Sequence, residues 1–140
     1  MIFLGVGLTI GFFIVFSVLT GAVDFLWQPW YLFGVIVLTK CALLTAHGIK
    51  AQQRACLACL SPAKADAETR QLAAAYFTTG KKAAIGAGWV TTIFGIIAVL
   101  AGGTPPEVAE FSYALTGIGY GVLWAYGVFY PIARAFKSGG

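Results

Sequence analysis

Residues 83–101 read AAIGAGWVTTIFGIIAVLA and contain no charged side chain. A helix needs about 20 apolar residues to cross the hydrocarbon core of a bilayer, so this stretch is long enough to be a transmembrane helix. Three comparable stretches occupy residues 2–23, 25–46 and 111–133, and Lys40 is the one charge inside any of them. The sequence therefore predicts an all-α membrane protein, a single domain over residues 1–140 with four transmembrane helices.

The composition of the whole chain favours the same class. Of its 140 residues, 59% are hydrophobic and only 10% are charged, and the mean hydropathy is +0.85. Soluble domains carry about a quarter charged residues, so a soluble enzyme, a nucleic-acid binder and a disordered segment are all disfavoured. We expect no enzymatic activity and no nucleic-acid partner.

The basic residues predict the orientation in the membrane. Region 48–82 carries six of them, the C-terminal tail carries Arg134 and Lys137, and the connections 24–30 and 102–110 carry none. Because Lys and Arg are retained on the cytoplasmic side, both termini and region 48–82 are expected in the cytoplasm of a bacterium, with the chain multi-pass in the inner membrane. Stretch 2–23 lacks the basic start of a cleaved signal peptide and is longer than its usual apolar segment, so we expect a permanent span.

Region 48–82 is predicted to form a helical hairpin. Residues 49–60 continue the second helix, and Ser61 and Pro62 have the residue types of an N-cap and a first helical position. Ala-rich residues 63–77 favour helix, and the hairpin would protrude about 20 Å at 1.5 Å per residue. Gly80 is a candidate position for a kink in the third helix.

Few side chains offer metal or redox chemistry. Cys56 and Cys59 form a CxxC pair, but a zinc site needs four ligands, and the other candidates are Cys41, inside a span, and His47. We interpret the pair as packing residues, reduced in the cytoplasm, and expect no cofactor and no bound metal.

Lys40 is the charge best placed for a function within the membrane. An ionisable residue inside a span is a functional hypothesis by default. The alternative is that its long stem carries the ammonium group to the interface. His47, at the end of the same span, is interpreted as an interfacial residue rather than a proton relay.

Carboxylates are absent from all four stretches. A small proton-coupled carrier that works alone normally needs a membrane carboxylate to bind the proton. If this protein moves protons, the titrating group is therefore expected on another chain.

Small residues repeat at helical spacing in the last two stretches. Gly88, Thr92 and Gly95 share one face of the third, with Thr91 beside them, and the fourth carries a row of small residues at Gly117, Gly121 and Ala125. Such rows allow close helix packing, or they line a pore with hydroxyls and glycine carbonyls. The spacing is compatible with both interpretations.

The sequence ALTGIGYGVLWAYG at 114–127, followed by Pro131, Ile132 and Ala133, resembles the last helix of the MotA/TolQ/ExbB proton-channel family. GWVTTIFG at 88–95 resembles the end of its third helix, and GTPPE at 103–107 its periplasmic turn. The likeness is strongest over residues 83–136 and closest to the MotA-like members. Those members carry a large cytoplasmic domain where this chain has only region 48–82, which makes a flagellar role doubtful.

The resemblance implies a channel-forming subunit of an energy-transducing rotary motor driven by ion-motive force, with protons expected rather than sodium. Family members form a pentameric ring around two copies of a single-span partner, MotB-, TolR- or ExbD-like, whose membrane Asp binds the proton. The family's helix-three threonine corresponds to Thr92, and its helix-four threonine aligns with Ile118, two residues after Thr116. We therefore expect an ion path lined by Thr91, Thr92 and Thr116, and a packing or pore face made of Gly88, Gly95, Gly117, Gly121, Ala125 and Pro131.

Two other functions remain open at this point. One is a stand-alone small-solute or ion transporter of the inner membrane that uses Lys40 and His47. The other is a non-conducting scaffold in which the rows of small residues only pack helices.

Overall fold

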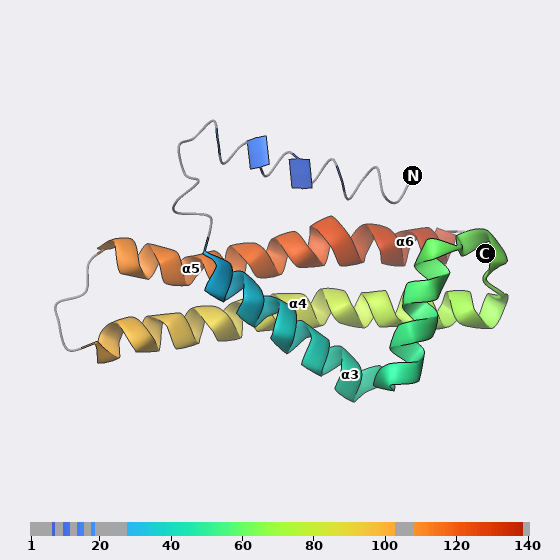
Figure 1. Cartoon of the computed structure of the whole chain (residues 1–140), viewed down its shortest axis with the longest axis horizontal. Helices are drawn as coiled ribbons and strands as arrows, with labels where there is room; N and C mark the ends of the chain where they lie inside the picture. The colour runs from blue at the N-terminus through green and yellow to red at the C-terminus, as the bar shows by residue number, and fades with distance from the viewer. Residues whose placement is uncertain are drawn as a thin grey trace.

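The protein is built from helices, and the residues that the structure describes contain no strand (Figure 1). The computed structural model describes residues 28–102 and 108–138, together with positions 7, 10, 11, 14, 15 and 18. In chain order the elements are α3 (Pro29–Leu60), the 3₁₀ helix η1 (Pro62–Lys64), α4 (Ala67–Ala101), α5 (Val108–Leu123), the π-helix η2 (Trp124–Phe129) and α6 (Tyr130–Ser138). The predicted all-α class is confirmed.

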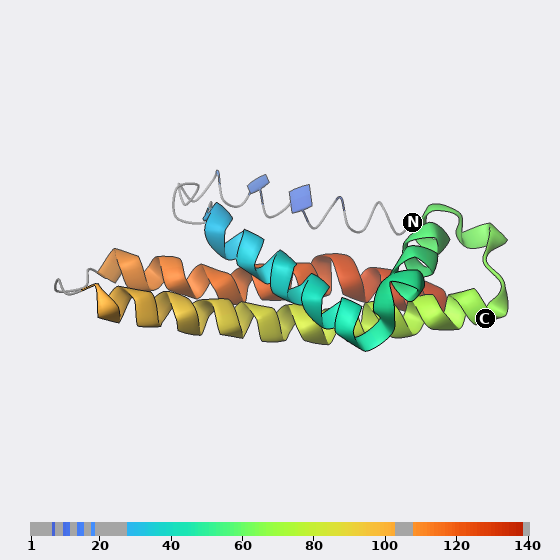
Figure 2. The same ribbon diagram turned by 60° about the horizontal axis from the view of Figure 1, so that its bottom comes forward.

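α3 consists of two helical segments joined at a sharp bend. Pro29 opens it at a position where the missing N–H is not needed, and it ends at Leu60, as the sequence predicts. Gly48 interrupts it with φ 74° and ψ 168°, a conformation that glycine adopts without a steric penalty. The bend turns residues 49–60 across α4 (Figures 1 and 2), instead of beside it as in the predicted hairpin.

The start of α4 differs from the prediction. Ser61 makes no side-chain capping bond, and Pro62 begins only the single turn of η1. α4 starts at Ala67, where Asp66 is the N-cap and its Oδ1 accepts a hydrogen bond of 2.9 Å from the Thr69 N–H. A carboxylate at this position satisfies a free N–H and interacts favourably with the helix dipole.

α4 then runs unbroken to Ala101, so the kink expected at Gly80 does not form. Gly80 is buried, and a Cβ there would collide with the ring of Phe129. This glycine therefore makes room for an aromatic side chain of the neighbouring helix.

α5, η2 and α6 follow one another as a single antiparallel rod beside α4 (Figure 1). Pro131 lies inside this rod, where proline has no N–H to donate and its ring clashes with the carbonyl four residues earlier. The π-helical turn just before it is wider, and the Tyr130 N–H donates to the Ala125 carbonyl, five residues back. The wide turn accommodates the proline without ending the helix.

Two helices of the described residues, α3 and α4, are long and apolar enough to cross a membrane. The prediction of four such spans is therefore too high for the part of the chain that is described. Stretch 2–23 falls outside it, apart from the six isolated positions. Stretch 111–133 is helical, but the π-helical turn divides it, and α5 alone has 16 residues.

Large side chains fill one end of the bundle and small ones the other. Near η1, the buried rings of Tyr76, Phe77, Phe129 and Phe136 form a cluster in which Phe77 and Phe136 are stacked with centroids 6.3 Å apart. Other large apolar side chains lie on the outside, among them Trp30, Phe33, Trp89, Phe94 and Leu100. So much exposed apolar surface suits lipid or another protein chain rather than water.

Asp66→Ala should loosen the first turn of α4, whereas Asp66→Asn should keep it, since Asn is an equally good N-cap. Hydrogen bonds from the Thr69 side chain and N–H hold the pKa of the Asp66 carboxyl below its usual value. Because the folded-state pKa is the lower one, this stabilisation is present at neutral pH and is lost as the pH falls through that pKa.

Amide exchange protection of residues 67–70 in detergent is the measurement, taken for each variant at pH 7 and through an acid titration. Wild type should lose protection as the Asp66 carboxyl becomes protonated, and Asp66→Asn should not. Equal protection in wild type and Asp66→Ala at pH 7 would contradict the capping role.

Candidate functional site

The predicted small-residue faces of α4 and α5 lie against each other within the chain. Each row repeats at three- or four-residue intervals, which keeps it on one side of its helix. All members are buried: Ala84, Gly88, Thr92 and Gly95 on α4, and Ala114, Gly117, Gly121 and, in η2, Ala125 on the facing rod.

The backbones of α4 and α5 are in close contact where the two rows of small residues cross. A Cβ on Gly88 would lie 2.8 Å from the Gly117 carbonyl oxygen and 3.0 Å from the Gly121 Cα. A Cβ on Gly121 would lie 2.7 Å from the Ala84 carbonyl oxygen. Backbone atoms cannot rotate away as side chains can, so these two positions require glycine for the helices to stay this close.

Thr92 lies inside this contact. Its side chain is only 2% exposed, and its Oγ1 accepts a hydrogen bond of 3.0 Å from the Ile118 N–H on α5. A Cβ on Gly117 would be 2.7 Å from that same Oγ1. The hydroxyl thus bonds the backbone of the neighbouring helix, and its own proton remains to be donated.

Thr91 is half-buried and contacts two helices. Its hydroxyl donates to the carbonyls of Ala87 and Gly88, at 2.9 and 3.0 Å. Its methyl carbon would be 2.7 Å from a Cβ on Gly34, so α3 packs against it at a glycine. Thr91 is the less enclosed residue of the adjacent pair, although a Cβ on Gly117 would lie 2.7 Å from the Oγ1 of each threonine.

The other predicted residues occupy different surroundings. Thr116 is buried and donates to the Tyr113 carbonyl of its own helix at 2.6 Å, and within the described part of the chain no hydrogen bond joins it to Thr91 or Thr92. Lys40 is exposed on α3. Pro131 is half-buried in α6, beyond the π-helical turn.

Aromatic residues that the sequence analysis did not single out complete the junction of the three helices. A Cβ on Gly95 would lie 2.7 Å from the ring and hydroxyl of Tyr31. The Tyr120 hydroxyl accepts a hydrogen bond of 3.0 Å from the N–H of Gln28, the N-cap of α3. No periodic pattern marks these residues, because each fills a gap left by one glycine or one helix end.

A second polar group lies where α3 bends. His47 Nε2 is 3.0 Å from Thr79 Oγ1 on α4, and the His47 ring is 5.5 Å from that of Tyr76. The Tyr76 hydroxyl is buried and has no hydrogen-bond partner among the residues that the structure describes. Cys56 is exposed and Cys59 half-buried, and both thiols are free. No group of three potential metal ligands occurs among the described residues.

Gly88→Ala and Gly121→Ala should each destabilise the fold by about 1–3 kcal/mol, the range for overpacking a close contact. Gly119→Ala is the matched control on α5, because nothing lies within 4 Å of a Cβ at that exposed position. Thermal unfolding in a fixed detergent measures the difference. Equal unfolding temperatures for Gly88→Ala and Gly119→Ala would refute the close α4–α5 contact.

Comparisons with known proteins identify no relative of this chain. No family model, no curated protein and no solved structure matches this chain. A functional assignment therefore depends on the geometry of the α4–α5 interface and on the resemblance described above.

Proposed function

We propose that this chain is the channel-forming subunit of a motor complex driven by ion-motive force, in which several copies form a ring around a single-span partner in a bacterial inner membrane. The observation that carries the proposal is the α4–α5 interface: a tightly packed apolar helix pair with the hydroxyls of Thr91 and Thr92 at the contact. Neither residues 69–102 nor residues 111–138 contain a carboxylate.

The missing carboxylate favours a partner. Threonine hydroxyls donate and accept hydrogen bonds but do not titrate near neutral pH. The proton carrier must then be supplied by another chain, as the membrane Asp of a MotB-, TolR- or ExbD-like partner would do. The resemblance of residues 83–136 to the MotA/TolQ/ExbB family favours the same arrangement, a pentamer around two partner copies.

The two adjacent threonines are suited to different tasks. Thr91 is the less enclosed side chain of the pair. Because its hydroxyl donates to the α4 backbone, its oxygen is left to accept a hydrogen bond, as from the protonated carboxyl group of a partner. Thr92 holds the α5 backbone through the Ile118 N–H. Thr92 meets a partner directly only when α4 and α5 separate at this level.

The four-span topology belongs to the same proposal. Within the described residues, α3 and α4 are two of its spans, and the α5–η2–α6 rod, with its π-helical turn, is a third. Both termini then lie in the cytoplasm, where the basic residues favour them. Region 48–82 is the part of the subunit that reaches the cytoplasmic load.

Thr92→Ala should reduce ion flux through the ring about two- to tenfold, because it removes the neutral hydrogen bond from the Ile118 N–H that fixes α5 against α4, about 0.5–1.5 kcal/mol. Thr92→Ser keeps the hydroxyl and should retain most of the flux. Thr45→Ala is the control, because the exposed Thr45 hydroxyl bonds only the Cys41 carbonyl of its own helix.

The measurement is proton uptake by vesicles that contain the subunit and its partner, with ring assembly checked by native mass spectrometry. Wild-type flux in an assembled Thr92→Ala ring would sink the role of Thr92. Failure of the wild-type chain to assemble with any single-span partner would sink the proposal itself.

One observation supports the alternative, a stand-alone transporter. His47, Thr79 and the unpartnered Tyr76 hydroxyl place polar groups together at the bend of α3, and Lys40 lies two turns before His47. Solute or ion flux by the purified chain alone, lost in His47→Phe, would favour this function over the motor.

A further inference from the structure

The bend at Gly48 gives the second half of α3 a direction of its own. The first half runs obliquely over α5 and α4, whereas residues 49–60 turn back across α4 near the end of the molecule that contains η1 (Figures 1 and 2). On the inner side, Ala55 and Ala58 are buried in the cluster that includes Ala73 and Tyr76. One face of this segment is therefore fixed to α4, and the opposite face is left open.

The open face is apolar as well as basic. Ile49, Leu57 and Leu60 are 65, 64 and 73% exposed. Lys50 and Arg54 are exposed on the same segment, Lys64 follows on η1, and no acidic residue occurs from 49 to 64. Exposed leucines beside basic residues are the composition of a helix that lies in a membrane interface.

The segment lies at the depth of the lipid headgroups if α4 crosses the bilayer. Tyr76, which packs under it, is five residues before Lys81, about 7.5 Å along the helix. Lys81 marks the boundary: its Nζ lies 4.6 Å from the ring centre of Tyr126 and 5.1 Å from that of Tyr130, as suits interfacial residues. The headgroup layer is itself about 5–8 Å thick on each side.

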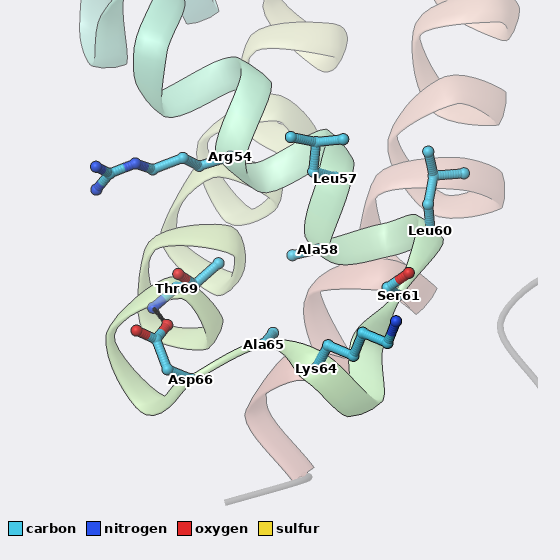
Figure 3. A pocket seen from close by; sticks show the side chains of 9 residues that line it. All are labelled: Arg54, Leu57, Ala58, Leu60, Ser61, Lys64, Ala65, Asp66 and Thr69. Atoms are coloured by element: carbon cyan, nitrogen blue, oxygen red, sulfur yellow. Dashed lines mark hydrogen bonds between the residues drawn. The ribbon is translucent and has the colours of Figure 1, made fainter.

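A hollow adjoins the end of the segment. It has a volume of about 560 Å³ and lies between the end of α3, η1 and the start of α4 (Figure 3). Arg54 and Lys64 contribute positive charge to its lining, and Leu57 and Leu60 apolar surface. Asp66 also lines it, with Oδ1 engaged by the Thr69 N–H.

We propose that residues 49–60 form an interfacial helix that binds anionic phospholipid of the cytoplasmic leaflet. Leu57 and Leu60 enter the acyl boundary, and Lys50, Arg54 and Lys64 contact lipid phosphates. Charge complementarity selects this occupant, because a purely apolar partner would leave three cations unpaired and a zwitterionic surface would attract them less. The proposal requires only a membrane-spanning chain and is independent of the motor function.

Spin labels report the position of the segment. Leu57→Cys is labelled in the full chain with its three native cysteines replaced by serine, and Gln71→Cys, exposed on α4, is the control. In vesicles of phosphatidylglycerol, oxygen should relax the label at 57 more than a water-soluble nickel complex does, and the label at 71 should show the reverse. A label at 57 that is as open to nickel as the label at 71, or that is shielded from both reagents by a second copy of the chain, would overturn the proposal.

Lipid selection is tested by native mass spectrometry of the chain with phosphatidylglycerol and phosphatidylcholine in competition. Each basic residue removed should lower the preference for phosphatidylglycerol about fivefold, so that Lys50→Gln, Arg54→Gln and Lys64→Gln together lower it about a hundredfold. Arg134→Gln with Lys137→Gln is the control on α6. An equal preference in the triple variant and this control contradicts the assignment, as does displacement of the lipid by inorganic phosphate alone.

Discussion

The backbone contact of α4 and α5 at Gly88, Gly117 and Gly121 is the constraint on which the rest of the fold depends. Apolar helices in a bilayer associate through close van der Waals contact and hydrogen bonds between helices, because lipid provides no hydrophobic force to push them together, and the same kinds of contact join α4 and α5. A side chain at either Gly88 or Gly121 would meet backbone atoms. The hydrogen bond from the Ile118 N–H to Thr92 spans the gap only because the helices are this close.

α3 is also held by close contacts at glycines, but here each glycine faces a side chain instead of backbone. On α3, Gly34 receives the methyl group of Thr91, and on α4, Gly95 receives the ring of Tyr31. Glycine on one helix thus faces a side chain on the other at successive levels. These contacts fix the first half of α3 firmly, and the aromatic cluster around Phe77 closes the opposite end of the bundle.

Features that depend on the spacing of residues could be predicted from the sequence. Features for which several residues are equally suitable could not, because local residue type does not distinguish among them. The rows through Gly88 and Gly117 follow from the geometry of a helix, so they could be read directly. Ser61 and Asp66 are both good N-caps, and the packing of the chain, rather than residue type, selects Asp66. With 18 glycines in the chain, nothing local distinguishes Gly48, which bends its helix, from glycines that only pack. The spacing correctly placed Thr92 on the small-residue face of α4. It did not indicate that α5 of the same chain covers that face.

The unbroken course of α4 has a mechanical consequence. Its 35 residues form a rod about 50 Å long, stiff because no glycine or proline interrupts its hydrogen bonds. The part of α3 after Gly48 is packed on the beginning of this rod through Ala55 and Ala58. A change in the tilt of α4 would therefore carry residues 49–60 with it.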